Sequence, residues 1–499
     1  MGEKESAPLY EALVAHAERR ARSYHVPGHK QRARWDEGLG AMEAVAYYDR
    51  LLALDVTELS DTDDLHHPEG PIAQAQAQAA ECFGAEETRL LVGGSTAGNL
   101  AMIIGICQPG DLVIVQRNVH KSIIHGLMLA GARAVLLQPE IDPLSGLATL
   151  PGARQLLEAI EKYREEAKAV ILSAPNYYGM APDLKPLIAH AHWHGIPVLV
   201  DEAHGPHFGF HPAFPESALQ AGADLVVQST HKMLSSMTMG AMLHMQGDRL
   251  PRQAIRQALT MVQSSSPSFP IMASLDLARR QVHTLGEGAF HEGLEAAKIA
   301  AEGLHKTSFR AIGYGEYATE GMGYDPFKLV LFDEKARLSG FELRDELERR
   351  KCVAEMADAR YVVMAFGTGS EPADGRMLIE ALAQIENSLE TRIFAELSVR
   401  RRAKEHEALD GNVGIRIPEP VSFGREVYAA KAIPFNESAG HIAAEWVIPY
   451  PPGIPVLYPG ETITEETVRQ LRQWKHQGAQ IQGASDSELN TIQVRESTN

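Results

Sequence analysis

Residues 223–232 read ADLVVQSTHK and place a lysine just past the end of a short apolar run. The run LVV has the branched residues of a buried strand, and Lys232 follows it behind two hydroxyls and a histidine. Ligands of open parallel sheets bind at the carboxyl ends of the strands, so this lysine is either a solvated loop residue or a functional amine. The neighbouring segments bear on that choice.

Short apolar runs alternate with helix-compatible segments between residues 88 and 245. The runs are TRLLVG, DLVIVQ, RAVLLQ, AVILSA, PVLVDEA, DLVVQS and GAMLHM. Nearly all are apolar without alternation, as strands covered on both faces must be, and their rhythm is that of βαβ units. The sequence therefore predicts an α/β protein whose large domain contains a mostly parallel sheet of these seven strands.

The pattern changes after about residue 285 to alternating helices and strands, which predicts a smaller α+β domain. A proline-rich segment at residues 449–461, PYPPGIPVLYPGE, interrupts regular structure. The predicted divisions are an N-terminal segment 1–65, a large domain 66–285, a small domain 286–400, a C-terminal region 401–478 and a disordered tail 479–499.

The composition limits the partners of the protein. The 499 residues carry a formal net charge of -18, which argues against nucleic acids and anionic membranes and leaves room for a small cationic substrate. Three cysteines are too few and too scattered for a disulfide framework. The charged N-terminus lacks the apolar core of a signal peptide, and no run reaches the length of a membrane span. We therefore expect a soluble, cytoplasmic protein.

Two polar clusters follow predicted strands early in the large domain. In GGSTAGN, residues 93–99, Ser95 or Thr96 is expected to cap a helix whose free N–H groups could hold a phosphate. In RNVHKS, residues 117–122, His120 could lie against an aromatic ligand. A structural cap and a loop histidine are the alternative interpretations of these two clusters.

A third cluster is more specific, because PVLVDEAHG places Asp201 at the tip of an apolar strand. A carboxylate there is costly unless it meets a cation, which is either a protonated pyridine nitrogen or a lysine or arginine of the chain. Pyridoxal 5′-phosphate needs four groups from a protein, and this sequence offers all of them. They are a cradle for the phosphate, a ring that stacks on the cofactor, an acid for the ring nitrogen, and the amine of Lys232.

Long motifs in the same order resemble the ornithine/lysine/arginine decarboxylase family, which has the aspartate-aminotransferase-like fold. The motifs are HVPGHK (25–30), DVTELSDTDDLHHPEG (55–70), GGSTAGN (93–99), RNVHKS (117–122), SAPNYYG (173–179), DEAHG (201–205), QSTHK (228–232), SSSPSFPIMASLD (264–276) and PYPPGIP (449–455). The resemblance is to the short form, since no receiver-like wing precedes the PLYEAL segment. It implies a homodimer, and it leaves the ring-shaped assemblies of longer members in doubt.

The resemblance also implies residue roles. Lys232 is expected to bind the cofactor covalently, and Asp201 is expected to pair with the pyridinium nitrogen. The other implied roles are phosphate binding by Ser95, Thr96, Ser229 and His231, ring stacking by His120, lining of the cofactor pocket by His204, completion of the partner's site by Ser264, Ser265 and Ser266, and recognition of a cationic substrate end by Glu355.

The predicted reaction is decarboxylation of a basic amino acid to its amine. Arginine is favoured, giving agmatine, ahead of lysine or ornithine, which would give cadaverine or putrescine. An aminotransferase or another enzyme of this fold is the alternative, and a non-catalytic protein is a further one. Histidines in HAHWH (190–194) and the trio His204, His207 and His211 raise a metal hydrolase as a further alternative. Only His190 and His194 share a helical face, so we expect no metal site.

Overall fold

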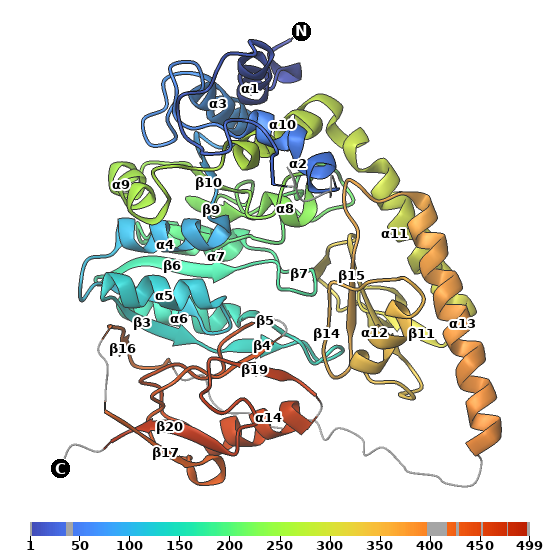
Figure 1. The fold of residues 1–499 in the computed structure, drawn as a ribbon. Coiled ribbons are helices and arrows are strands. Elements are labelled where there is room, and N and C mark those ends of the chain that lie inside the picture. The colour runs from blue at the N-terminus through green and yellow to red at the C-terminus, as the bar shows by residue number, and fades with distance from the viewer. Residues whose placement is uncertain are drawn as a thin grey trace.

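An eight-stranded sheet forms the centre of the computed structural model, which describes residues 2–35, 43–396, 417–425, 429–450, 453–476 and 478–496 (Figure 1). The strand order is β1-β10-β9-β8-β6-β2-β3-β16. The strands are β1 (Glu87–Leu91), β2 (Leu112–Gln116), β3 (Arg133–Leu137), β6 (Ala167–Ser173), β8 (Val198–Asp201), β9 (Leu225–Gln228), β10 (Ala241–Met245) and β16 (Val421–Ser422). The seven predicted strands are all present, and β16 adds an eighth from the C-terminal region.

The middle of this sheet is parallel. The parallel pairs are β2 with β3, β2 with β6, β6 with β8, and β8 with β9, whereas β10 runs antiparallel to both β9 and β1. Asp201 is paired in register with Ser173 on one side and with Val227 on the other. The carboxyl ends of β6, β8 and β9 therefore meet at one edge of the sheet.

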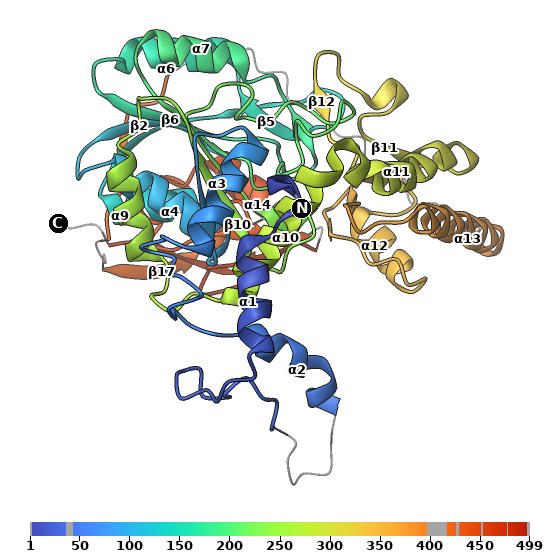
Figure 2. The same cartoon turned by 90° about the horizontal axis from the view of Figure 1, so that it is seen from above.

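Helices cover both faces of the sheet, as the unbroken apolar strands require (Figure 2). Alternate residues of β2 enter different cores: Val113 and Val115 pack in one, and Leu112 and Ile114 in the other. The first core is closed by α4 (Gly94–Ile106), α5 (Lys121–Ala130) and α9 (Arg252–Val262), and the second by α6 (Ala153–Tyr163) and α7 (Lys185–Trp193).

The N-terminal helices pack on the long helix α10 (Phe269–Leu285). Asp276 of α10 accepts a 2.9 Å hydrogen bond from the backbone N–H of Leu9, in the first turn of α1. The helix α3 starts at Pro71 and ends before Gly84, whose φ of 74° suits glycine, as the sequence predicts. These N-terminal helices are α1 (Pro8–Glu18), α2 (Glu43–Leu54) and α3 (Pro71–Phe83).

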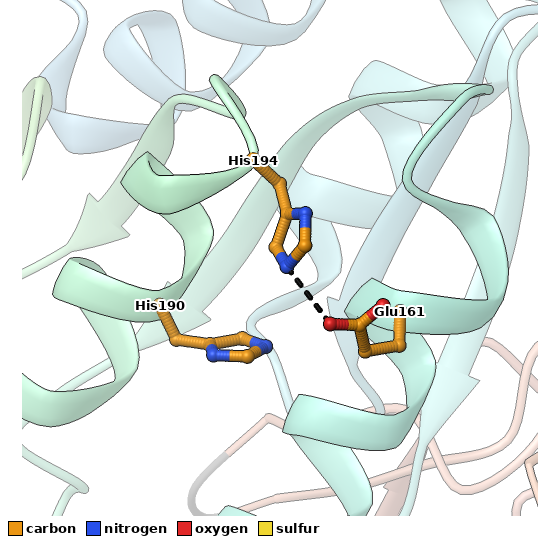
Figure 3. A group of neighbouring side chains, drawn as sticks. All are labelled: Glu161, His190 and His194. Atoms are coloured by element: carbon orange, nitrogen blue, oxygen red, sulfur yellow. Dashed lines mark ion pairs between the residues drawn. The ribbon is translucent and has the colours of Figure 1, made fainter.

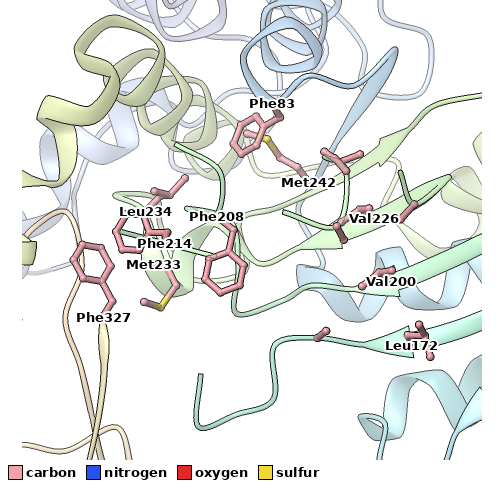
Figure 4. Packing of buried hydrophobic residues seen from close by; sticks show 14 of the residues in the cluster. Phe83, Leu172, Val200, Phe208, Phe214, Val226, Met233, Leu234, Met242 and Phe327 are labelled. Carbon is pink, nitrogen blue, oxygen red and sulfur yellow. The ribbon is translucent and has the colours of Figure 1, made fainter. Parts of the chain in front are cut away.

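A second, four-stranded sheet has the order β11-β13-β15-β14 and belongs to the smaller α+β part of the chain. Its strands are β11 (Phe309–Ala311), β13 (Lys328–Asp333), β14 (Met356–Ala357) and β15 (Val362–Ala365), and its helices are α11 (His291–Gly303), α12 (Gly340–Glu348) and α13 (Pro372–Glu396). An aromatic cluster joins this part to the large sheet (Figure 4): the rings of Phe214 and Phe327 lie 4.8 Å apart. Met233 and Leu234, next to Lys232, are buried in the same core.

The C-terminal region packs against the end of β2. Arg117 donates hydrogen bonds of 2.8 Å to the carbonyl oxygen of Pro455 and to Oε2 of Glu461. The elements of this region are β17 (Ala430–Pro434), β18 (Ile448–Tyr450), α14 (Glu465–His476), β19 (Gln480–Gln482) and β20 (Thr491–Arg495).

The expectation of a disordered tail over residues 479–499 is wrong for the described part of that tail. β19 pairs with β18, and β20 pairs with β17. The side chains of Ile492 and Val494 are fully buried in a separate small core. The alternation of apolar and polar residues in TIQVR is the sequence signal of a half-buried strand.

The remaining elements are short connections. They are η1 (Glu3–Glu5), β4 (Pro139–Ile141), β5 (Ala148–Pro151), β7 (Met180–Ala181), α8 (Thr230–Met233), η2 (Gly286–Phe290), η3 (Leu304–Lys306), η4 (Gly315–Tyr317), β12 (Gly323–Tyr324) and η5 (Phe435–Glu437). Within the described ranges, the structure has no helix with the length and apolarity to cross a membrane.

We expect Ile492→Ala to lower the free energy of unfolding of the C-terminal region by about 2–5 kcal/mol, because it leaves a cavity in a packed core. Thermal unfolding and limited proteolysis measure the effect, with the exposed Gln482→Ala as the control. An Ile492→Ala protein as stable and protease-resistant as this control would contradict the packed arrangement of β20.

Candidate active site

Two polar segments meet where the parallel strands β8 and β9 end. β8 ends at Asp201, and β9 ends at Gln228, just before α8. Lys232 lies in α8, and its Nζ is 2.9 Å from Nε2 of His204 in the turn after β8. The strand-end lysine is therefore part of a side-chain cluster and not a solvated loop residue.

The surroundings of this pair favour its uncharged forms. Burial lowers the pKa of Lys232, and the positive charge of Lys328 lowers it further, whereas Asp201 and Glu355 act in the opposite direction. Burial, together with the charge of Lys232, holds the pKa of His204 well below its usual range. A neutral His204 can accept a hydrogen bond from Lys232 through Nε2, which holds a nucleophilic amine in place.

Asp201 is the buried carboxylate at the tip of β8, with only 4% of its surface exposed. Its Oδ2 accepts a 2.8 Å hydrogen bond from Nδ2 of Asn99, and its Oδ1 accepts a 3.2 Å bond from the N–H of Ala203. Within the described chain, no lysine or arginine is at ion-pair distance from this carboxylate. Neutral donors hold Asp201 in place, so its negative charge is available to a cationic ligand.

A hydrogen-bond chain links Asp201 to His120. Asn99 Nδ2 also donates to Oγ of Ser122 at 2.9 Å, and that Oγ lies 2.8 Å from Nδ1 of His120. The backbone N–H of Ser122 donates a 3.3 Å hydrogen bond to Nδ1 of His120, so this nitrogen is an acceptor and the proton of the neutral imidazole lies on Nε2. Burial lowers the pKa of His120, which keeps this ring neutral. Asn99 and Ser122 were not predicted, although both lie in quoted motifs.

The GGSTAGN motif forms the first turn of α4, but not with the predicted cap. The expectation that Ser95 or Thr96 caps this helix is wrong, because Gly93 is the N-cap and makes no side-chain capping bond. Gly94, at φ 70°, turns the chain so that both hydroxyl residues fall inside the helix. Ser229 Oγ donates to Ser95 Oγ at 2.9 Å, which brings two predicted phosphate ligands together.

His231, also predicted at the phosphate, lies in α8 next to Lys232. Its Nδ1 donates a 2.9 Å hydrogen bond to the carbonyl oxygen of Gly240, and burial lowers the pKa of this imidazole. A neutral ring in this tautomer has no proton on Nε2 to offer a phosphate oxygen. His231 thus ties α8 to the start of β10, and its role at the phosphate stays a prediction.

Two residues beside Lys232 were missed in the sequence: Tyr177 and Lys328. The ring of Tyr177 lies 4.4 Å from the ring of His204, 5.8 Å from Nζ of Lys232 and 5.9 Å from Nζ of Lys328. Lys328 is buried at the start of β13, and burial lowers its pKa. Nothing in the run KLVLF distinguishes this lysine from a solvated one, because its position depends on how the second sheet packs against the first.

Glu355, the predicted substrate ligand, reaches the same cluster through Tyr177. Its Oε1 accepts a 3.1 Å hydrogen bond from the hydroxyl of Tyr177, and the residue as a whole is exposed. The nearby Asp358 accepts a bond from Tyr178 at 2.5 Å. A carboxylate at the open side of the lysine cluster is thus available to a second charged group.

The residues predicted at a subunit interface, Ser264, Ser265 and Ser266, are all exposed. The carbonyl oxygen of Ser264 accepts a 2.8 Å hydrogen bond from Nε2 of His66, in the DVTELSDTDDLHHPEG motif. Two motifs of the family resemblance, far apart in sequence, therefore adjoin on the surface.

The trio His204, His207 and His211 of the metal-hydrolase alternative does not converge on one point. His207 Nε2 pairs with Oδ1 of Asp325 at 2.9 Å, and both side chains are fully buried. His211 Nδ1 accepts from the N–H of Ala213 at 3.0 Å. His204 is bonded to Lys232 instead. His207 holds the turn after β8 against the second sheet, which is a structural role.

The fold, with an amine-bearing helix at the end of a central parallel strand, is that of the pyridoxal-phosphate fold type I enzymes. A lysine decarboxylase structure from Francisella novicida superposes with a TM-score of 0.79 at 18% identity, covering 99% of this chain and 82% of that chain.

The chain belongs to the ornithine/lysine/arginine decarboxylase family. The family models "Orn/Lys/Arg decarboxylase, major domain" and "Orn/Lys/Arg decarboxylase, C-terminal domain" match residues 7–312 and 426–485. The uncharacterized protein YaaO of Bacillus subtilis is 38% identical over 486 residues, covering 96% of both chains. The arginine decarboxylase of the same organism is 34% identical over 499 residues, covering 98% of this chain and 97% of its own. Membership makes the chain an amino acid decarboxylase.

We expect Lys328→Met to raise the pKa of Lys232, because it removes a buried positive charge that disfavours a second ammonium. Lys328→Arg keeps the charge and serves as the control. The measurement is the acetylation rate of Lys232 in the cofactor-free protein over a pH series, followed by peptide mass spectrometry. If the pH midpoint of Lys232 acetylation in Lys328→Met is unchanged or lower than in the unaltered protein, the two lysines are not coupled.

Proposed function

We propose that the protein is a pyridoxal 5′-phosphate-dependent decarboxylase of a basic amino acid, with arginine as the first choice. The observation that carries this proposal is Lys232, an amine with a lowered pKa at a strand end, hydrogen-bonded to a neutral His204. The relatives named arginine decarboxylase support arginine over lysine or ornithine.

The strand-end residues fit this cofactor. Lys232 supplies an amine for its aldehyde, and Asp201 supplies a buried carboxylate without an ion-pair partner in the described chain for its ring nitrogen. The first turn of α4, whose N–H groups no side chain of the described chain caps, suits a phosphate together with Ser95 and Ser229. His120, a neutral ring fixed by its hydrogen-bond chain, suits the face of an aromatic ligand.

When bound, pyridoxal 5′-phosphate supplies an aldehyde that condenses with amines and a ring that accepts the electron pair released as CO₂ leaves. The residues of the chain supply the electrostatics and the proton transfers. The carboxylate of Asp201, whose two oxygens are fixed by Asn99 and Ala203, would stabilise positive charge at the ring nitrogen. Lys232 Nζ and His204 Nε2, 2.9 Å apart, are the pair that can carry the proton that replaces the lost carboxylate at Cα.

The reaction is tested by incubating the purified holoprotein with arginine, lysine and ornithine separately and identifying the products. We expect CO₂ release and agmatine from arginine at a higher kcat/KM than cadaverine or putrescine from the other two. Formation of keto acids without CO₂ would indicate an aminotransferase instead. Lys232→Ala with equal cofactor present is the control for amine formed without the enzyme's own lysine.

Glu355 is proposed to bind the cationic end of the substrate. It accepts a hydrogen bond from Tyr177, whose ring lies 4.4 Å from the ring of His204 and 5.8 Å from Nζ of Lys232. A carboxylate here can select a guanidinium or ammonium over a neutral side chain, since a hydrogen bond to a charged group contributes about 1.5–3 kcal/mol.

We therefore expect Glu355→Gln to raise the KM for the basic substrate by about ten- to a hundredfold, with cofactor binding unchanged. Glu348→Gln, an exposed glutamate of α12, is the matched control. Steady-state kinetics measure the effect, and the absorption spectrum of the bound cofactor reports its occupancy. An unchanged KM in Glu355→Gln would remove this residue from the substrate site.

The enzyme is proposed to act as a homodimer with shared sites. Ser264, Ser265 and Ser266 are exposed beside the DVTELSDTDDLHHPEG motif. Residues that complete a partner's active site must be exposed in the isolated chain. Mixing Lys232→Ala chains with chains in which Ser264, Ser265 and Ser266 are replaced by bulky residues should restore activity, because one mixed site then contains only native residues. Sedimentation gives the dimer mass, and no recovery of activity in mixed dimers would contradict shared sites.

The enzyme is also proposed to be cytoplasmic. Cys82, Cys107 and Cys352 are free, and burial raises the pKa of Cys82 and of Cys107 to about 12. Separate, protonated thiols suit a reducing compartment. Recovery of the native protein mainly from an extracytoplasmic fraction would overturn this placement.

A further inference from the structure

Two histidines and a glutamate converge on the helical layer formed by α6 and α7 (Figure 3). His190 and His194 lie four residues apart at the end of α7, so they share a face of that helix. Glu161 faces them from α6. β8 begins just after this cluster and ends at Asp201, which places the cluster at the opposite edge of the sheet from the lysine site.

The spacing suits a small cation. One ligand atom from each of the three residues lies within 4.8 Å of the others. Nε2 of His194 and Oε1 of Glu161 are 3.1 Å apart, and the two imidazole rings lie 5.1 Å apart at 67°. Ligands about 2.0–2.1 Å from a tetrahedral Zn²⁺ are roughly 3.3 Å from one another, so small side-chain rotations bring this set to the metal.

The histidine nitrogens that face the cluster lack other partners. Nε2 of His190 is buried, with no hydrogen-bond partner in the described part of the chain, and Nε2 of His194 contacts only Glu161 there. A buried polar atom without a partner calls for an explanation, such as an ion. His192, between these two, is engaged elsewhere, since its Nε2 lies 2.7 Å from Oδ2 of Asp224.

Arg164 orients Glu161 but pairs with only one of its two carboxylate oxygens. Nη1 of Arg164 lies 2.9 Å from Oε2 of Glu161, which is the other oxygen from the one that faces His194. A cation bound through Oε1 leaves this pair intact, and Arg164 then acts as an outer partner that orients the carboxylate. Glu161 is half exposed, so a water can reach a fourth coordination position.

We propose that Glu161, His190 and His194 bind one divalent transition-metal ion of the Zn²⁺ class, with water as the fourth ligand. Two imidazoles and one carboxylate match the preferences of Zn²⁺, and they do not suit Mg²⁺, which prefers oxygen ligands alone. The bound ion joins α6 to α7 and stabilises the folded state by mass action. At this cluster the proposal replaces the sequence expectation of no metal.

The test is calorimetric titration of Zn²⁺ into chelator-treated, tag-free holoenzyme, with Co²⁺ absorption to report the geometry. We expect one ion per chain and a tetrahedral Co²⁺ spectrum, with Mg²⁺ silent. His190→Gln and Glu161→Gln should each raise the Kd by about tenfold or more, which equals about 1.4 kcal/mol. Glu161 is on the surface, so Glu161→Gln keeps the test valid if His190→Gln fails to fold.

The matched control is His67→Gln, which removes an exposed histidine paired with Glu69 at 3.1 Å. It should leave the Kd unchanged, because a histidine–glutamate pair without a third ligand does not form the site. The proposal is overturned if the Kd for Zn²⁺ is weaker than about 100 µM, which corresponds to a binding free energy of about -5.5 kcal/mol. It is equally overturned if His67→Gln weakens binding as much as His190→Gln and Glu161→Gln do.

Discussion

The buried carboxylate of Asp201 is the constraint on which the rest of the site depends. A charge with 4% exposure at a strand tip is costly unless donors and a cation compensate it. Asn99 supplies one donor, and it reaches Asp201 because Gly98 lets α4 approach the sheet: a Cβ at Gly98 would lie 2.7 Å from a methyl carbon of Val227. The close approach of α4 to the sheet therefore also fixes the position of the Asp201 carboxylate.

Residues at the start of the second sheet also influence the lysine site at the end of the first sheet. His207 and Asp325, a buried pair, hold the turn after β8 against the segment that leads into β13. Lys328, three residues beyond Asp325, then lies close enough to lower the pKa of Lys232. Burial is the main cause of the lowered pKa of Lys232, and the position of the smaller domain adds to it through Lys328, which couples domain packing to reactivity.

The strands and the strand-end residues were predictable because they depend on local patterns. Unbroken apolar runs followed by polar residues located Lys232 and Asp201, and the parallel topology brought them together. Lys328 and Tyr177 could not be found in this way, since their roles arise from contacts between segments far apart in sequence. Ser95 was predicted as a cap because its type favours caps, but Gly93 and Gly94 provide the turn instead. The ordered end of the chain was missed because its short strands gain stability by pairing with residues about 30 to 65 positions away.

The central claim is that Lys232 is the amine that carries the cofactor, and covalent mapping tests it most directly. The holoprotein is reduced with borohydride, digested, and its pyridoxyl-labelled peptide is sequenced by mass spectrometry. The account predicts a single adduct on Lys232, in the peptide that contains QSTHK, and its loss in Lys232→Ala. An adduct on Lys328, Lys121 or Lys30, or none on a protein that still releases CO₂ from its substrate, would contradict it.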